Sequence, residues 1–256
     1  MSKPTATEKI IYQTTTPFQE IKLSRLSDGE VALYLDDAIQ FVSGYDDRVY
    51  HGVLAAYPAR MLDGHGSALI LGGGDGLAAR NLLKDPNIEK VVMVELDPGV
   101  IEFASTDPIM VHLNEGAFQN KKLKVRTEDA REYLGRSPKE RFDIVIVDFP
   151  DPLDENLETL YSEDLYRKMK NHATERPIYA VQSSSAFGDV EDEVAETLCR
   201  ATGSFTVPVR FRGERMADGT IIFAGKGLKP AMLALPPEYI APFEDDIAGS
   251  GGGDVF

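Results

Sequence analysis

Acidic side chains and a glycine-rich loop stand where apolar segments of the sequence end. Gly72-Gly73-Gly74-Asp75-Gly76 follows one such segment, and Glu95, Asp129 and Asp148 follow three others. If these segments are parallel strands, their carboxyl ends meet at one edge of the sheet, which is where open α/β sheets bind ligands. Taken singly, Asp129 is better explained as the cap of a helix that includes Tyr133. The four positions together predict a small-molecule site at that edge.

The loop and the two acids after it are typical of a nucleoside site. Glycines such as Gly72 and Gly74 let the backbone approach a ligand at a helix N-terminus. Gly74 to Ala79 matches the loose GxGxxA pattern of dinucleotide sites, but Asp75 would repel a pyrophosphate and favours a cationic amine. About 20 residues later, Glu95 is placed to accept hydrogen bonds from ribose hydroxyls, in NAD or in an adenosylmethionine derivative. Asp129 could then accept from the adenine amine, with the small Ala130 leaving room for the ring.

Two further carboxylates, Asp148 and Asp151, lie in a turn stiffened by Pro150 and Pro152. Paired acids share a proton, bind a metal or bind an organic cation. The four histidines, at positions 51, 65, 112 and 172, are scattered and none is near this turn in sequence. We therefore expect a cationic substrate and no metal.

The elements that must position these residues are predicted from hydrophobic periodicity. Short alternating segments between Ile10 and Gln40 indicate a small antiparallel sheet, and a helix is expected over Asp46–Ala56. Strands alternating with helices then indicate an α/β fold, a Rossmann-like, mostly parallel sheet with helices on both faces. We expect an N-terminal β-sheet domain with a linking helix over residues 1–62, a nucleoside-binding catalytic domain over 63–240 and a disordered tail over 241–256. The strands are expected at 68–72, 91–95, 123–126, 142–148 and 178–182, with an edge hairpin from 205–211 and 220–224, and the helices begin near residues 77, 98, 129, 162 and 189.

The amino-acid composition restricts the classes of molecule that this protein is expected to bind. The 256 residues contain 42 acidic and 27 basic side chains, a formal net charge of −15, which makes nucleic acid and anionic membrane poor partners. Cys199 is the single cysteine, so an internal disulfide framework is excluded and a cytoplasmic location is expected. Cys199 itself is expected to be buried on the helix with Val194, Leu198 and Ala201.

Several motifs resemble the spermidine synthase family of polyamine aminopropyltransferases, closest to its bacterial spermidine-synthase-like members. The resemblance covers roughly residues 10 to 190. The motifs are Tyr12-Gln13, Leu33 to Gln40, Asp46-Asp47 with Tyr50-His51, the glycine loop, Val94 to Asp97, Asp148 with Asp151-Pro152, Leu160-Tyr161-Ser162 and Val181-Gln182-Ser183.

The resemblance implies transfer of a 3-aminopropyl group from decarboxylated S-adenosylmethionine, a co-substrate, to a small amine such as putrescine, with no permanently bound cofactor. It assigns nucleoside contacts to Gln13, Gln40, Glu95, Asp129 and Ala130, the donor ammonium to Asp75, amine contacts to Tyr50, His51, Asp151 and Gln182, and the base to Asp148. It also implies a homodimer or higher homo-oligomer. An adenosylmethionine-dependent methyltransferase and a non-catalytic binding homologue are the alternatives.

The sequence departs from the family pattern in its C-terminal part. Gly52 replaces the usual acid after the Tyr-His pair, and Leu77 occupies the sixth position of the glycine loop. The family's aromatic C-terminal segment is replaced by Arg210-Phe211-Arg212-Gly213-Glu214-Arg215. These arginines would disfavour a cationic amine if they faced the pocket.

Overall fold

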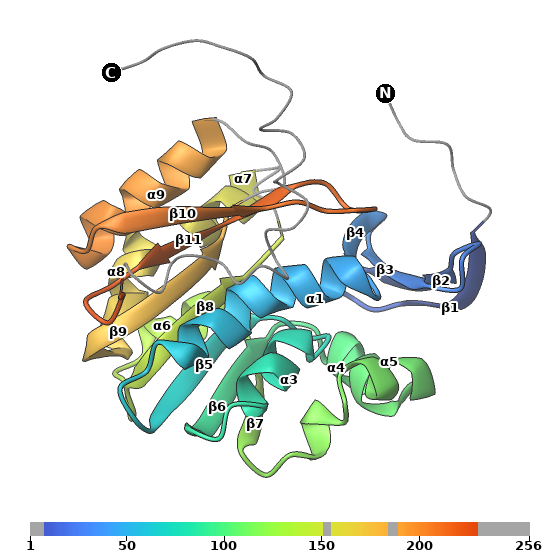
Figure 1. Ribbon diagram of the computed structural model, residues 1–256, viewed down its shortest axis with the longest axis horizontal. Coiled ribbons are helices and arrows are strands. Elements are labelled where there is room, and N and C mark those ends of the chain that lie inside the picture. Colours follow the sequence, from blue (N-terminus) through green and yellow to red (C-terminus); the bar gives the residue numbers. More distant parts are fainter. Residues whose placement is uncertain (1–7, 151–154, 184–188, 230–256) are drawn as a thin grey trace, which may run out of the picture.

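Two β-sheets organise the chain in the computed structural model, which describes residues 8–150, 155–183 and 189–229 (Figure 1). The N-terminal sheet is antiparallel with the strand order β1-β2-β3-β4. Its strands are β1 (Lys9–Thr15), β2 (Glu20–Arg25), β3 (Val31–Leu35) and β4 (Ala38–Val42). Ile21 and Leu23 of β2 are fully buried, whereas Glu20 and Lys22 between them are only partly buried, so the alternating apolar residues face the covered side of the sheet. The predicted N-terminal sheet is confirmed.

The second sheet has seven strands in the order β10-β11-β9-β8-β5-β6-β7. Its first five strands in sequence, which are all parallel, are β5 (Gly66–Gly72), β6 (Ile88–Glu95), β7 (Leu123–Thr127), β8 (Phe142–Asp148) and β9 (Ala173–Gln182). β10 (Thr206–Phe211) and β11 (Gly219–Ala224) form an antiparallel hairpin at the edge beyond β9. The mostly parallel sheet and its edge hairpin are therefore confirmed.

Helices cover both faces of this sheet, as predicted. Ala68 and Ile70 of β5 pack on the side of α1 to α3, whereas Leu69 and Leu71 pack on the side of α6, α8 and α9. Burial on both sides explains the almost continuous apolar sequence of β8. Beyond α1 and α2, the helices are α3 (Leu77–Leu83), α4 (Pro98–Thr106), α5 (Pro108–Leu113), α6 (Ala130–Gly135), α7 (Glu155–Glu158), α8 (Glu163–Asn171) and α9 (Asp189–Thr202), with short 3-10 turns at Ala117–Gln119 and Thr159–Tyr161.

A continuous helical segment joins the two sheets and is longer than expected. It consists of α1 (Tyr45–His51), a π-helical stretch (Gly52–Ala56) and α2 (Tyr57–Arg60). The sequence suggested an end near Ala56 because of Pro58, which lies instead in the first turn of α2. Proline donates no N–H to the helix at this point, and the wider π-helical turn directly before it is the local departure from regular α-helix.

The N-terminal sheet packs against the helices that follow the glycine loop. One carboxylate oxygen of the buried Asp97 accepts hydrogen bonds from Thr16 Oγ1 (2.7 Å) and Gln19 Nε2 (3.0 Å), and the other caps α4 through the N–H of Gly99. Tyr12 stacks on Phe103 of α4 with ring centroids 4.4 Å apart. These contacts hold the small sheet beside the carboxyl edge of the large one (Figure 1).

One local prediction is wrong. Cys199 is exposed, not buried, because it follows Leu198 directly and is rotated about 100° away from the buried stripe of α9. The boundary between residues 62 and 63 stays a prediction, and the predicted tail at 241–256 lies outside the described residues. Among the helices that the structure describes, none has the length and apolarity needed to cross a membrane.

Candidate active site

The predicted strand ends meet in one row. β7, β6, β5, β8 and β9 are successive neighbours in the sheet, so Asp129, Glu95, the glycine loop, Asp148 and Gln182 follow one another along its carboxyl edge. From β5 the chain adds β6 and β7 on one side and then returns to add β8 on the other side of β5. Open α/β sheets bind ligands at this switch point, between β5 and β8.

The glycine loop is wedged between two acidic strand ends. Gly72 has a φ of +83°, and a Cβ there would lie 2.2 Å from the carbonyl oxygen of Asp148. A Cβ on Gly74 would lie 2.8 Å from the Glu95 carboxylate. Side chains at either position would therefore push the loop away from its neighbours.

Asp148 is hydrogen-bonded to a tyrosine at this edge. The hydroxyl of Tyr50, from α1, donates a hydrogen bond of 2.5 Å to Asp148 Oδ1. Burial raises the pKa of Asp148 to about 6; the charge of His51 and the bond from Tyr50 oppose that rise, and the charge of Asp75 adds to it. Burial, together with Asp148, also raises the pKa of Tyr50, so the phenol stays protonated as a donor. A carboxylate with a pKa near 6 is ionised at pH 7 and is more basic than an ordinary one.

Asp75 lies inside the loop and belongs to the same electrostatic cluster. Its Oδ1 accepts the N–H of Leu77 at 2.8 Å. Burial raises the pKa of Asp75, while the charge of His51 and the Leu77 bond limit the rise. The carboxylates of Asp75 and Asp148 repel one another, and a bound cation would relieve that repulsion.

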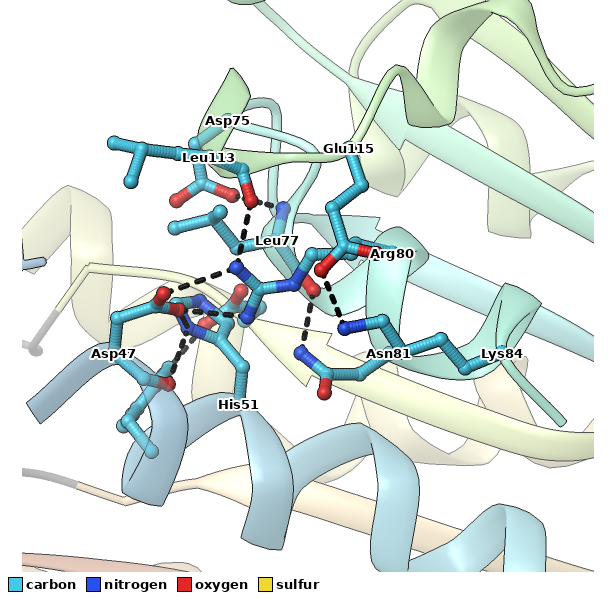
Figure 2. A network of polar contacts seen from close by, with 11 residues as sticks. Asp47, His51, Asp75, Leu77, Arg80, Asn81, Lys84, Leu113 and Glu115 are labelled. Atoms are coloured by element: carbon cyan, nitrogen blue, oxygen red, sulfur yellow. Dashed lines mark hydrogen bonds and ion pairs between the residues drawn. The ribbon is translucent and has the colours of Figure 1, made fainter. Parts of the chain in front are cut away.

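His51 is tied to a buried ion pair behind the site (Figure 2). Its Nδ1 lies 2.8 Å from Asp47 Oδ1, and Arg80 holds both oxygens of that carboxylate at 2.9 and 3.0 Å. Burial disfavours a charged imidazole, but the bond to Asp47 and the charges of Asp47, Asp75 and Asp148 raise the pKa of His51. Burial likewise opposes ionisation of Asp47, but His51 and Arg80 outweigh it and lower the pKa of Asp47 to about 2.

Glu95 ends β6 with a carboxylate that is poorly solvated. Burial raises its pKa to about 7, although the N–H groups of Asp97 and Leu96 favour the ionised form. The Asp97 N–H donates to Glu95 Oε1 at 3.0 Å. A carboxylate in this position gains from hydroxyl donors such as those of a ribose.

Asp129 is the N-cap of α6, so the capping interpretation is confirmed. Its Oδ1 accepts the N–H of Arg131 at 2.7 Å, and the Arg131 guanidinium bonds the same carboxylate. The adjacent Ala130 is buried. A contact between Asp129 and adenine stays a prediction.

Of the predicted amine-binding residues, the structure describes Gln182 but not Asp151. Gln182 ends β9, and its Oε1 accepts the hydroxyl of Tyr161 at 2.7 Å. The Tyr161 hydroxyl also lies 3.0 Å from the carbonyl oxygen of Pro150, which fixes the start of the loop after β8. Asp151 lies outside the described residues.

Gln13 and Gln40 lie on the N-terminal sheet and are not brought into contact with the row of acids in the described parts of the chain. Gln13, exposed on β1, donates to Glu20, and Gln40 on β4 donates to the carbonyl oxygen of Ala38. Their assignment to the nucleoside stays a prediction.

The segment over residues 210–215, at the end of β10, lies close to α1. Phe211 of β10 meets the ring of Tyr50 edge to face at 5.8 Å. Arg210 pairs with the buried Glu191 at 2.7 Å, and Arg215 Nε donates to Asp28 at 2.9 Å. The charges of Arg210 and Arg215 are thus neutralised by carboxylates of other elements.

Sequence reasoning missed three residues that support the site. Asp46 and Asp47 were noted only as parts of a motif, and Arg80 was not considered. The available signals were the i, i+4 spacing of Asp47 and His51 and a lone charge among the apolar residues of α3. Within the described ranges no group of three His, Cys, Asp or Glu side chains is arranged to hold a metal.

Comparisons with known proteins agree with this geometry. The model of the spermine/spermidine synthase domain matches residues 47–210. Polyamine aminopropyltransferase 2 of Aquifex aeolicus is 41% identical over 180 residues, which are 70% of this chain and 36% of that protein. Polyamine aminopropyltransferase 2 of Bacillus cereus is 39% identical over 177 residues, 68% of this chain and 47% of that protein. The chain thus spans between about a third and a half of the length of these relatives.

Solved structures show the same fold. A spermidine synthase in complex with the transition-state analogue AdoDATO superposes with a TM-score of 0.78 at 24% identity, covering 92% of this chain and 80% of that one. The spermidine synthase of Thermotoga maritima gives a TM-score of 0.76 at 24% identity over 92% of this chain and 79% of that one.

Proposed function

The chain belongs to the spermine/spermidine synthase family, and from this premise we propose that it is a polyamine aminopropyltransferase. In the proposed reaction a 3-aminopropyl group moves from decarboxylated S-adenosylmethionine to a di- or polyamine such as putrescine, giving spermidine and methylthioadenosine. The donor is a co-substrate, and the reaction calls for no permanently bound cofactor.

The observation that carries the proposal is the position of Asp75, inside the glycine loop and within electrostatic reach of Asp148. A carboxylate here would repel the carboxylate of intact adenosylmethionine and attract the ammonium that ends the decarboxylated donor. Glu95 would accept the ribose hydroxyls, and Asp129 and Ala130 would border the adenine. Gln13 and Gln40 would complete the nucleoside contacts from the N-terminal sheet.

The chemical step needs a neutral amine. An alkylamine has a pKa near ~10.4, so its deprotonation at pH 7 costs about 4.6 kcal/mol. Asp148 would accept this proton while the nitrogen lone pair forms a bond to the carbon beside the sulfonium. The C–S bond breaks, its electron pair stays on sulfur, and a neutral thioether leaves. Tyr50 would orient Asp148 and the attacking nitrogen.

The amine would be held by side chains around Asp148. Gln182 Oε1 and, in the neutral form of the imidazole, His51 Nε2 offer acceptors for its N–H groups, and Asp151 is assigned to the distal ammonium. Phe211, packed on Tyr50, supports an apolar wall along the methylene chain.

The proposal includes a homo-oligomer and a cytoplasmic location. The first rests on the family resemblance, and the second on the single cysteine of the chain.

The direct test is to incubate the purified protein with decarboxylated adenosylmethionine and putrescine, cadaverine, diaminopropane or spermidine, and to identify products by mass spectrometry. We expect methylthioadenosine together with one amine that has gained an aminopropyl group. Methylation of the amine from intact adenosylmethionine would indicate a methyltransferase. Binding of methylthioadenosine without turnover of any amine would indicate a non-catalytic homologue.

A further inference from the structure

An ion pair beside the proposed amine site also lines a pocket. Asp47 and Arg80 line this pocket together with Arg48, Lys84, His112 and Glu115. The pocket therefore borders the network of Asp47, Arg80 and His51 drawn in Figure 2.

The pair is built as a bidentate clamp. Arg80 Nη1 donates to Asp47 Oδ2 at 3.0 Å and to the carbonyl oxygen of Leu113 at 2.8 Å, while Nη2 donates to Asp47 Oδ1 at 2.9 Å. Arg80 and Asp47 are only 7% and 4% exposed. A guanidinium that holds both oxygens fixes the plane of the carboxylate, which a lysine ammonium cannot do.

The fixed carboxylate in turn fixes an imidazole. Asp47 Oδ1 and the carbonyl oxygen of Asp47 lie 2.8 and 3.1 Å from His51 Nδ1. Two acceptors at Nδ1 require a proton on that nitrogen. Nε2, which makes no hydrogen bond within the described ranges, is then the nitrogen left for a ligand.

Stability alone is a poor explanation for this arrangement. Two buried charges are costly to desolvate, and apolar side chains of similar volume would stabilise the fold as well or better. The pair instead lies directly behind the imidazole that shares its electrostatic environment with Asp75 and Asp148.

We propose that Arg80 is a positioning residue of the amine site: through its bidentate pair with Asp47 it holds His51 in one orientation and one tautomer, with Nε2 directed at the acceptor amine. This inference rests on the proposed function, because it assigns His51 to the amine. Arg80 itself touches neither donor nor amine in this proposal.

The kinetic test measures the activity of Arg80→Ala with and without guanidinium, a small cation that can enter the pocket beside position 80. We expect kcat/KM for the amine to fall by about 10- to 100-fold, the range of losses seen when an outer partner of a metal-bound imidazole is removed, while the Kd of methylthioadenosine stays within about twofold. Because the pocket opens onto the missing guanidinium, millimolar guanidinium chloride should restore several-fold of the lost activity. Urea or sodium chloride at the same concentration should not.

Lys84→Met is the matched control. Lys84 lines the same pocket one helical turn after Arg80, but it pairs with Glu115 and makes no contact with Asp47 in the described ranges. We expect this variant to keep its activity and to show no response to guanidinium. A folded Arg80→Ala protein with unchanged kcat/KM, or one whose activity guanidinium does not restore, would overturn the proposal.

A second readout needs no turnover. The chain has four histidines, so the ring nitrogens of His51 can be assigned by ¹⁵N NMR with His51→Asn as reference. At a pH above the pKa of His51, where the ring is neutral, we expect one tautomer protonated at Nδ1 in the wild type and a mixture in Arg80→Ala; identical spectra would contradict the proposal. If Arg80→Ala does not fold, Arg80→Lys replaces it, and the criteria are then the fall in kcat/KM and the mixture of tautomers, because the lysine side chain leaves no space for guanidinium. Absence of aminopropyl transfer by the wild type would refute the proposed function but leave this spectroscopic result to decide the role of Arg80.

Discussion

Asp148 combines a raised pKa with a hydrogen bond to a protonated phenol, which suits a group that receives a proton at neutral pH. We predict that Asp148→Asn lowers kcat by at least about 100-fold because it removes the base. The Kd of methylthioadenosine, measured by calorimetry, should change by less than about twofold. The wild-type kcat should also rise as pH increases through about 6, where Asp148 ionises. This rise of kcat with pH should be absent in Asp148→Asn. Undiminished turnover by Asp148→Asn would refute the assignment of the base.

Glu95 makes donor binding dependent on pH. Its pKa in the empty site is about 7, and ribose hydroxyls donate to the ionised form. The affinity for methylthioadenosine should therefore be constant above pH 7 and fall by up to about tenfold per unit below it, with proton release on binding in the lower range. Calorimetry in buffers of different ionisation enthalpy measures both effects. Glu95→Gln should bind more weakly and without this pH dependence; an equal dependence in both proteins would contradict the prediction.

At the scale of elements, the β10–β11 hairpin depends on one buried side chain of α1. Asp46 accepts the N–H groups of Glu214 (2.6 Å) and Arg215 (3.1 Å), which ties the hairpin to the helix that carries Tyr50. Asp46→Ala leaves two backbone donors without their acceptor, at a cost of about 1–3 kcal/mol. We predict faster amide exchange at positions 214 and 215 and a lower urea midpoint.

The matched control for the hairpin is Asp28→Ala. Asp28 bonds the exposed guanidinium of Arg215 and, within its own turn, the N–H of Glu30, but it makes no contact with the N–H groups of 214 and 215 in the described ranges, and salt bridges at the surface contribute little. Exchange at 214 and 215 should stay near the wild-type rate. If both variants changed it equally, the anchoring role of Asp46 would be wrong.

The elements themselves could be predicted from the sequence, because the parallel strands are covered on both faces and read as nearly continuous apolar segments. The row of acids followed from the rule that parallel strands end at one edge. Contacts between side chains could not be predicted in this way. Asp47 and Arg80 are 33 positions apart, and only the packing of α1 on α3 brings them together. The helix through Pro58 was missed because propensity gives no signal for a π-helical turn, and Gln13 and Gln40 remain assigned by resemblance alone.

At the scale of the whole molecule, the net charge of −15 favours the approach of polyamine cations. We predict that kcat/KM for the amine falls several-fold as salt is raised, since the Debye length shrinks from about 30 Å at 0.01 M to about 8 Å at 0.15 M. The fall should be steeper for a triamine than for a diamine. The Kd of neutral methylthioadenosine serves as the control and should not change; an equal salt dependence of both would indicate a general effect on the protein.

The central claim is that the site selects a donor without a carboxylate. The most direct measurement is a competition in which equal concentrations of decarboxylated and intact adenosylmethionine react with the amine accepted in the panel, with Asp75→Asn alongside. We predict that the wild type forms methylthioadenosine and an aminopropylated amine almost exclusively, and that Asp75→Asn loses much of this preference for the decarboxylated donor. Formation of S-adenosylhomocysteine and a methylated amine by the wild type would contradict the claim.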